Sequence, residues 1–312
     1  MDWYYIVLIC LLSIILLFFI TLFICFYLTF YNKNKNYDEN KFEIPNDEIY
    51  KVHQKIMKED FDNASLLPYK KLSVKSFDGL ILNGKYYEKI KGAPIEIMFH
   101  GYRGNAKRDM SSGIKRAFAC NRNALIVDQR ASGYSQGHII TFGINERKDV
   151  IKWIDKVIEE FGNDVKIILT GISMGAATVL NSSNMELKEN VIGILADCGY
   201  DSAKTIIKKV LKDLKLPVNL FYFLIKTSAR IFGNFNLEET SPLEAVKDSK
   251  VPIIFYHGTN DNFVPCNMSM NLYNHCSNKN KKLVLIENAG HGIAYLVDPD
   301  KYINELNLFY KN

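Results

Sequence analysis

The chain has 312 residues, 48% of them hydrophobic, which is enough to bury a large core and excludes a mostly disordered protein. Its 39 basic and 34 acidic residues are scattered together and give a net charge of +5, which argues against a nucleic-acid partner and only weakly for an anionic surface. The cysteines are dispersed without a C-x-x-C pair or a zinc-ligand pattern. We therefore expect free thiols, no metal and no cofactor.

The first element is an uncharged apolar run from Trp3 to Tyr31, and about 20 such residues suffice to cross the hydrocarbon core of a bilayer. A cleaved signal peptide is the alternative, but Asp2 stands where a basic residue is expected and no small-residue cleavage site follows. We therefore predict a retained single-pass membrane anchor over residues 1–31. Three lysines lie beyond it: Lys33, Lys35 and Lys41. By the positive-inside rule they favour a cytoplasmic location for the rest of the chain.

Residues 32–69 are predicted to form a polar linker followed by a short amphipathic helix. In this helix Ile49, Val52 and Ile56 share one face, and Asn46 is the expected N-terminal cap. We expect the apolar face to pack on the globular domain, with docking on a membrane surface as the alternative.

Residues 70–312 are expected to form one α/β domain with a mostly parallel sheet. KLSVKSFDG and LILNGKYYE alternate apolar and polar residues around Asp78 and Gly79, which predicts an antiparallel hairpin. Six short apolar runs follow, and such runs are typical of parallel strands covered by helices on both faces. They are PIEIMFHG, ALIVDQR, VKIILTG, VIGILAD, VPIIFYHG and KKLVLIE. Helical periodicity over residues 201–245 predicts a helical cap inserted between the fourth and fifth runs.

The segment TGISMGAAT, residues 170–178, places a serine between two glycines directly after an apolar run. At a sharp turn from strand to helix, a serine takes a strained conformation that exposes its hydroxyl, and its neighbours must be small. Gly171 and Gly175 meet that requirement. The helix N-terminus also favours negative charge that develops there. The pattern predicts Ser173 as a nucleophile.

A serine nucleophile needs a base, and the base needs a carboxylate that orients it. Among the six histidines, His291 lies in a glycine-flanked loop after the last predicted strand and is the best candidate. Asp261 follows the VPIIFYHG run, so it should lie at the sheet edge shared by the ends of parallel strands. His257 is expected to stabilise the turn, and Asp197 and Asp201 are the alternative acids.

Acyl transfer also needs N–H donors for a developing oxyanion. In HGYRG, after the first parallel run, His100 and Gly101 lead a turn that lets the backbone N–H of Tyr102 face the serine. Met174, next after the nucleophile, supplies the second N–H. A glycine-rich turn without a ligand is the alternative for this loop.

With H-G-Y-R-G, G-I-S-M-G, H-G-T-N-D and A-G-H-G in this order, the chain resembles the α/β-hydrolase superfamily over roughly residues 70–310. It is most similar to bacterial membrane-anchored members related to serine aminopeptidases, prolyl-oligopeptidase-like hydrolases and small esterases. The resemblance implies an α/β-hydrolase fold in which a helical cap roofs the pocket. It also implies these roles: nucleophile Ser173, acid Asp261, base His291, and oxyanion donors Tyr102 and Met174.

Two further segments fit the resemblance. In DQRASGYSQG, Asp128 and Arg130 are expected to be structural, and Ala131 stands where glycine is usual. The cap carries four aromatic residues that either line an acyl pocket or seal the cap against the core: Phe221, Tyr222, Phe223 and Phe232.

Together these motifs predict a membrane-tethered serine hydrolase that cleaves an ester, thioester or amide of a small acyl or peptide substrate through an acyl-enzyme. A peptidase for short peptides is one alternative, and it would need an acidic anchor for the substrate amine, for which Glu238, Glu239 and Glu244 are candidates. A non-catalytic binding module with the same fold is another. The sequence does not indicate an oligomeric state.

Overall fold

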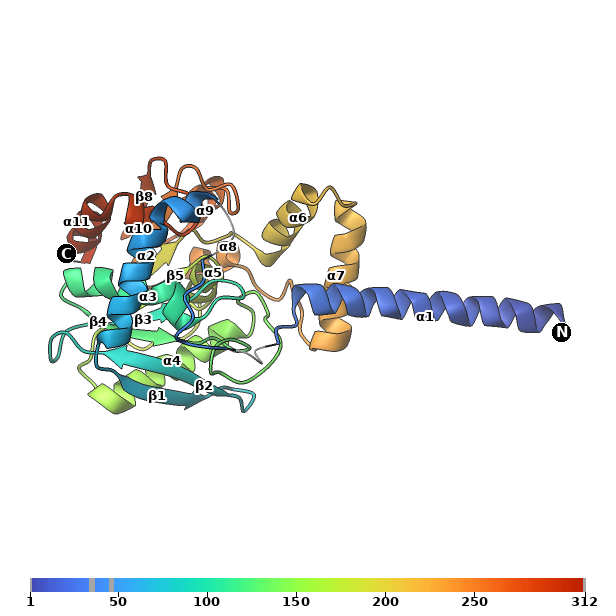
Figure 1. The fold of residues 1–312 in the computed structure, drawn as a ribbon, viewed down its shortest axis with the longest axis horizontal. Coiled ribbons are helices and arrows are strands. Elements are labelled where there is room, and N and C mark those ends of the chain that lie inside the picture. The colour runs from blue at the N-terminus through green and yellow to red at the C-terminus, as the bar shows by residue number, and fades with distance from the viewer. Residues whose placement is uncertain (1, 34–36, 45–47, 311–312) are drawn as a thin grey trace.

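The computed structural model describes residues 2–33, 37–44 and 48–310, and it confirms the predicted mixed sheet. Eight strands lie in the order β1-β2-β4-β3-β5-β6-β7-β8. The last six strands are parallel, whereas β1 and β2 run antiparallel to their neighbours. Helices cover both faces of the sheet (Figure 1). The strands are β1 (Lys70–Lys75), β2 (Ile81–Tyr87), β3 (Ile95–Phe99), β4 (Asn123–Val127), β5 (Ile167–Ile172), β6 (Val191–Asp197), β7 (Ile253–Gly258) and β8 (Lys281–Ile286).

Most of the helices that follow the strands are amphipathic and bury one face, whereas the helix after β5 is buried on all sides. They are α3 (Ala106–Ala119), α4 (Glu146–Phe161), α5 (Met174–Asn181), α9 (Asn267–His275), α10 (Ala294–Val297) and α11 (Pro299–Tyr310). The insertion after β6 holds α6 (Ala203–Asp213), α7 (Val218–Gly233), α8 (Pro242–Ala245) and the short 3-10 helix η1 (Val246–Asp248). Ser202 begins the cap by accepting a hydrogen bond from the Thr205 N–H at 3.0 Å.

The N-terminal helix α1 (Trp3–Thr29) is long and apolar enough to cross a membrane, and it projects from the body of the protein (Figure 1). The side chains of its first part, residues 3–20, are exposed on every side of the helix. In its last turns Leu22 and Phe26 are buried, and Phe30, directly after the helix, is fully buried. The ring of Phe30 lies 5.8 Å from that of Phe142 and 5.2 Å from that of Phe235. The end of α1 is therefore packed into the globular domain.

The chain beyond α1 continues along the same surface. Tyr31 forms an antiparallel bridge with Ile139, and the Asn32 side chain donates to the carbonyl of Ala131 at 2.7 Å. Tyr102 and Arg103 reach the end of the helix from the loop after β3. The Tyr102 hydroxyl donates to the Thr29 carbonyl at 2.7 Å, and the Arg103 guanidinium donates to the carbonyls of Leu28 and Tyr31 at 2.8 and 3.1 Å. These bonds satisfy carbonyls that a helix end leaves without partners.

The helix α2 (Glu48–Leu66) packs along α3 (Figure 1). Its buried Asp60 accepts hydrogen bonds from Ser112 at 2.7 Å and from Lys115 at 2.8 Å. The prediction that Val52 belongs to the packing face was wrong, because this side chain is 81% exposed. The buried residues of α2 are Asp60, Phe61 and Ala64. The predicted cap, Asn46, lies outside the described residues.

The loop after β4 has the structural role expected for Asp128 and Arg130. The Asp128 carboxylate accepts the N–H groups of Ala106 and Tyr134, both at 2.9 Å. Arg130 forms ion pairs with Asp149 at 2.8 Å and with Asp78 at 2.9 Å. Ala131, where glycine is usual, has a φ of +61°, so its backbone takes the left-handed conformation that glycine adopts at the lowest cost.

Candidate active site

The turn between β5 and α5 places the serine hydroxyl at the edge of the sheet. Ser173 has a φ of +55° and a ψ of −117°, which is a strained conformation for a residue with a side chain. A Cβ on Gly175 would lie 1.9 Å from the carbonyl oxygen of Phe99, and one on Gly171 would lie 2.2 Å from Gly175. Gly175 is required because the turn is pressed against the end of β3, and Gly171 because the start of α5 folds back onto it.

Three side chains distant in sequence meet at this edge. The Ser173 Oγ lies 2.9 Å from Nε2 of His291, and Nδ1 of the same ring lies 2.7 Å from Oδ2 of Asp261. The carboxylate can only accept, so Nδ1 carries the ring proton and Nε2 accepts from the serine hydroxyl. In this arrangement the imidazole is oriented to take the serine proton.

Three hydrogen-bond donors hold Asp261 as a buried carboxylate, and a second histidine lies beside it. Its Oδ1 accepts the N–H groups of Phe263 and Val264 at 2.9 and 2.8 Å. Its Oδ2 faces both His291 and Nε2 of His257, the latter at 3.2 Å. Burial by itself would raise the pKa of Asp261, but the hydrogen bonds from His257 and His291 outweigh burial and lower the pKa to about 2.

His257 also lies beside Asp261, and the sequence pattern did not indicate this contact. Its Nε2 donates to the Val264 carbonyl at 2.8 Å, and its Nδ1 lies 2.6 Å from the hydroxyl of Ser269. The ring therefore stabilises the turn, as expected, and also faces Asp261. Its position at the end of β7, four residues before the acid, was the available signal.

The two expected oxyanion donors come from different elements, because Tyr102 lies in the loop after β3 and Met174 begins α5. The partly buried carboxylate of Asp109 accepts the Gly101 N–H at 3.0 Å and pairs with Arg108, which fixes the turn that carries Tyr102. Asp109 is a further residue that the motif did not reveal. Met174 is the first residue of α5, so its N–H has no acceptor within the helix.

His100 has a structural place in the same loop. Its Nδ1 donates to the carbonyl of Gly101 at 2.8 Å, and its Nε2 accepts the Gln129 N–H at 3.0 Å. The ring is fully buried. It therefore ties the end of β3 to the loop after β4 rather than facing the serine.

A cavity of about 530 Å³ opens beside the serine and the imidazole. It runs under α2, whose Tyr50 and Met57 form part of its wall, and Tyr50 donates to the His291 carbonyl at 2.9 Å. Phe263 and Tyr102 line the part of the cavity near the serine. The helix α2 thus covers a substrate-sized space as well as packing on α3.

Among the described residues, neither of the two alternative acids is hydrogen-bonded to His291. Asp197 lines the cavity, where its Oδ2 accepts the hydroxyl of Tyr302 at 2.9 Å and burial raises the pKa of its carboxyl. Its Oδ1 has no hydrogen-bond partner within the described part of the chain. Asp201 accepts from the side chain of Asn271 at 3.0 Å. Asp261 is the carboxylate in contact with His291.

Three side chains near the serine could in principle share a metal ion. Single ligand atoms of Cys198, Asp261 and His291 lie within 4.8 Å of one another. Burial raises the pKa of the Cys198 thiol well above its usual value, which disfavours the thiolate that binds metals. The carboxylate and imidazole are already joined by a hydrogen bond. This donor set fits an acid-base chain better than a metal centre.

The four aromatic residues of the cap that the sequence suggested are not among the residues that line the cavity beside Ser173. Phe232 packs its ring 5.5 Å from Phe23 and 5.8 Å from Phe26, so it seals the cap against α1. Tyr222 donates to Glu238 at 2.9 Å, and the side chain of Phe223 is exposed. Of the two alternatives for these aromatic residues, sealing the cap rather than lining the pocket therefore holds for the cavity beside Ser173, because α7 turns its buried face toward α1 and α6.

Comparison with known proteins identifies the family. A profile of the prolyl oligopeptidase family matches residues 134–311, which include Ser173, Asp261 and His291. The fold and this match define a hydrolase of the α/β-hydrolase superfamily. The chain belongs to the prolyl oligopeptidase family.

Among known proteins, the chain is similar to the uncharacterized protein YqkD of Bacillus subtilis, with 24% identity over 191 residues, 61% of this chain and 62% of that protein. The match thus spans less than two thirds of the relative. Among solved structures, the Pyrococcus furiosus esterase Pf2001 has a TM-score of 0.64 and 21% identity, covering 81% of this chain and 92% of its own. An acylaminoacyl peptidase of Pyrococcus horikoshii has a TM-score of 0.56 and 18% identity, covering 80% and 42%. These likenesses support the shared fold.

Proposed function

We propose that this protein is a membrane-anchored serine hydrolase that cleaves an ester, thioester or amide bond through an acyl-enzyme on Ser173. The hydrogen-bonded chain from Ser173 through His291 to Asp261 is the observation that carries the proposal. His291 takes the hydroxyl proton as Ser173 attacks the carbonyl carbon, and it returns this proton to the leaving group. Water activated by the same imidazole then releases the acyl group.

The developing oxyanion is stabilised by the backbone N–H groups of Tyr102 and Met174. Preorganised donors of this kind stabilise the transition state more than the ground state, because the charge appears only as the bond to the serine forms. Asp261 keeps Nδ1 of the imidazole protonated and stabilises the imidazolium during the reaction.

The peptidase alternative needs an acidic anchor, and the three glutamates first considered are already paired. Glu238 pairs with Lys226, Glu239 with Arg147 at 2.8 Å, and Glu244 with Lys247 at 2.8 Å. Asp197 faces the cavity instead, with one carboxylate oxygen unpartnered among the described residues. An amine-bearing substrate would place its cation there. Aminoacyl amides are therefore among the substrates to be tested.

The anchoring part of the proposal rests on α1. Its apolar composition and its exposed first part suit a bilayer, and the lysines that follow it favour a cytoplasmic catalytic domain. Because the last turns of α1 pack into the domain, the full chain is the appropriate form for every assay.

The direct test is covalent labelling of the full chain in detergent or nanodiscs with a fluorophosphonate, followed by mass spectrometry of the labelled peptide. We expect the label on Ser173. Turnover is then compared on short acyl p-nitrophenyl esters, acyl thioesters and aminoacyl amides. Absence of a label at Ser173 together with absence of turnover would favour the binding-module alternative.

The contact between Tyr102 and the end of α1 is expected to position the oxyanion loop. In Tyr102→Phe the hydrogen bond to the Thr29 carbonyl is lost, and a bond worth about 1 kcal/mol corresponds to a fall in kcat of up to about fivefold. KM should change little because the ring stays in place. Tyr134→Phe, on an exposed ring, is the control. Equal kcat values for both variants would contradict the positioning role.

The depressed pKa of Asp261 predicts a contribution to stability that depends on pH. A carboxyl with a folded-state pKa of about 2 stabilises the fold above its unfolded-state pKa of about 4, and the contribution is lost as the pH falls toward 2. The shift corresponds to about 2 kcal/mol. The difference in thermal stability between wild type and Asp261→Asn should therefore be large at pH 6 and should narrow near pH 2. A stability difference between the two proteins that does not change with pH would contradict this role of the Asp261 carboxylate.

A further inference from the structure

The helix α7 of the cap exposes an apolar stripe. Leu220, Phe223 and Ile231 are 56%, 58% and 48% exposed, and with Thr227 between them their spacing places them on one side of the helix. The opposite side of α7 is buried on the cap and on α1. Large apolar side chains aligned on an exposed face mark an interaction surface.

This stripe lies where α1 leaves the domain. The ring of Phe232 in α7 contacts the rings of Phe23 and Phe26 in α1, and α7 runs across α1 rather than along it (Figure 1). The exposed part of α1, from Trp3 to Ile20, is about 27 Å long at 1.5 Å per residue. The hydrocarbon core of a bilayer is about 30 Å thick. With α1 spanning that core, α7 lies at the level of the headgroups.

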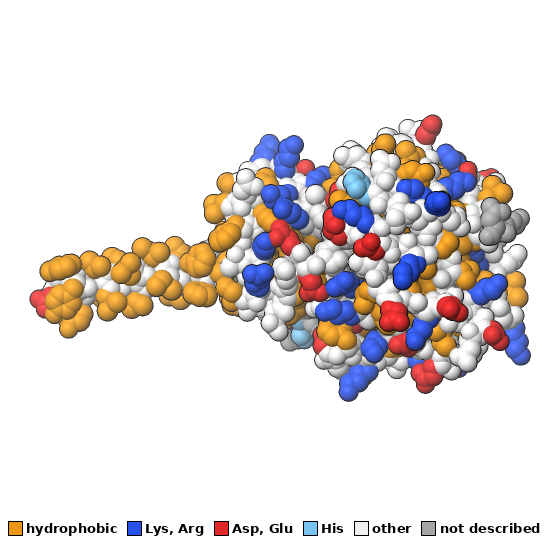
Figure 2. Space-filling model, turned by 180° about the vertical axis from the view of Figure 1, so that it is seen from behind, with side chains coloured by type: hydrophobic (Ala, Val, Ile, Leu, Met, Phe, Trp, Pro, Cys, Tyr) orange, Lys and Arg blue, Asp and Glu red, His pale blue; other side chains and the backbone are white. Residues whose placement is uncertain are grey.

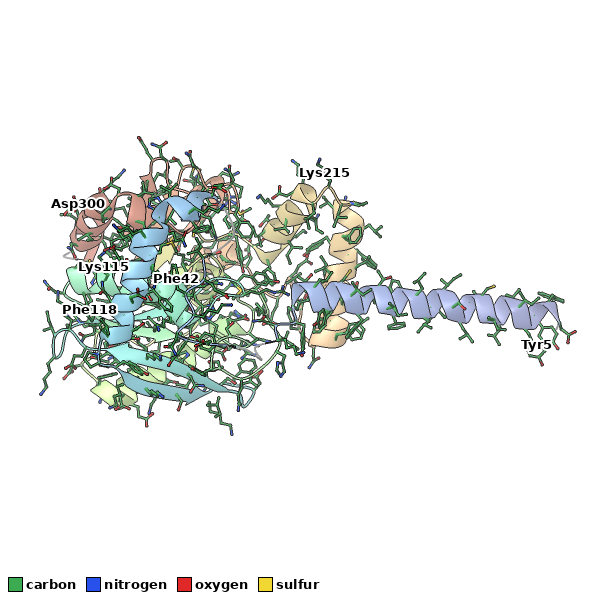
Figure 3. The ribbon with its side chains drawn as sticks, in the orientation of Figure 1. Tyr5, Phe42, Lys115, Phe118, Lys215 and Asp300 are labelled. Carbon is green, nitrogen blue, oxygen red and sulfur yellow. The ribbon has the colours of Figure 1, made fainter. Side chains whose placement is uncertain are left out.

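The charge around the stripe is strongly basic. Residues 203–233 contain seven basic side chains and one acidic one. Some are paired within the protein, as Lys209 is with Asp213 at 2.5 Å. Lys212, Lys215 and Arg230 are exposed, and Lys215 marks the turn between α6 and α7 at the tip of the cap (Figure 3). In Figure 2 basic and apolar side chains lie side by side where α1 joins the body.

We propose that α7 and the turn before it form a lipid-binding surface that lies flat on an anionic bilayer, with Leu220, Phe223 and Ile231 inserted among the headgroups. A helix with an apolar stripe flanked by lysines is suited to this position. Lysine and arginine side chains near anionic lipid add electrostatic attraction. The proposal rests on the membrane anchoring proposed for α1, and it adds a second contact that fixes the cap against the membrane.

The test uses the full chain in vesicles whose lipids are brominated near the glycerol end of the acyl chains. In a Trp3→Phe background the remaining Trp153 is buried in the core and is not reached by lipid. Phe223→Trp then reports on α7. The control is Leu308→Trp, which is equally exposed at 58% but lies on α11, at the end of the body opposite α1. Phe223→Trp fluorescence should fall by about half or more, and that of Leu308→Trp should not.

Two further arms make the outcome decisive. Quenching at Phe223→Trp should increase when phosphatidylglycerol is added, and Lys212→Glu with Lys215→Glu should reduce this increase. Quenching of Trp3 in the wild type reports the span independently. If Trp3 is quenched but Phe223→Trp behaves like Leu308→Trp, the lipid surface is overturned and the anchor stands. A Phe223→Trp signal that depends on protein concentration, without quenching, would instead assign the stripe to a second copy of the chain. If Trp3 is not quenched, both proposals fall.

Discussion

Ser173→Ala is expected to lower kcat for acyl ester hydrolysis by about four to six orders of magnitude, with little change in KM. The alanine removes the attacking oxygen that lies 2.9 Å from the imidazole of His291 and leaves the substrate cavity in place. Fluorophosphonate labelling should disappear in parallel. Thermal unfolding should stay close to that of the wild type, because the Oγ makes few contacts apart from the one to His291.

The matched control is Ser183→Ala. Ser183 is also buried, and its hydroxyl has no hydrogen-bond partner among the described residues, so its loss should affect neither rate nor stability. Residual labelling or turnover in Ser173→Ala at the wild-type level would assign the chemistry to another residue. Loss of activity in the control would show that replacing a serine next to α5 acts through folding.

Gly175→Ala is expected to be the most disruptive single-methyl change at the turn. The added Cβ would meet the carbonyl oxygens of Phe99 and His100 at 1.9 and 2.8 Å, and backbone atoms of a central strand cannot move away at low cost. We expect the free energy of unfolding to fall by about 3 kcal/mol or more, so that most of the expressed protein is misfolded. Thermal unfolding and limited proteolysis of the solubilised full chain measure the effect.

Gly92→Ala provides the comparison for this variant. Gly92 has a φ of +78°, but nothing lies within 4 Å of its added Cβ, so only backbone strain of about 1 kcal/mol is expected. Similar unfolding temperatures for the two variants, or full activity in Gly175→Ala, would mean that the turn and β3 are less closely packed than the structure has them.

The strands and the meeting of Ser173, His291 and Asp261 could be anticipated because short-range patterns determine them. Continuous apolar runs define parallel strands, and parallel strands bring their ends to one edge. A glycine pair around the serine follows from steric exclusion at a single turn. Each of these inferences needs only local sequence together with one general rule of sheet topology.

The contacts that could not be anticipated join surfaces far apart in the chain. Nothing local indicates that Asp109 fixes the turn at Gly101, or that His257 shares Asp261 with His291. Likewise, the periodicity of α2 was compatible with Val52 on the buried face, and only the packing on α3 excludes it. Side-chain pairing across elements depends on three-dimensional placement, which spacing along one helix does not determine.

The docking of α1 has one more consequence for how such an enzyme would meet its substrates. Since Phe30 is embedded in the body and Asn32 is already bound to it, there is no slack chain between the proposed span and the catalytic domain. With α1 in a bilayer as proposed, the domain would rotate about the membrane normal and diffuse laterally, while the opening of its cavity would stay at a fixed distance from the bilayer. Substrates held at the membrane surface would then meet the enzyme by lateral diffusion in two dimensions. Substrates in the surrounding solution would have to diffuse to the membrane first.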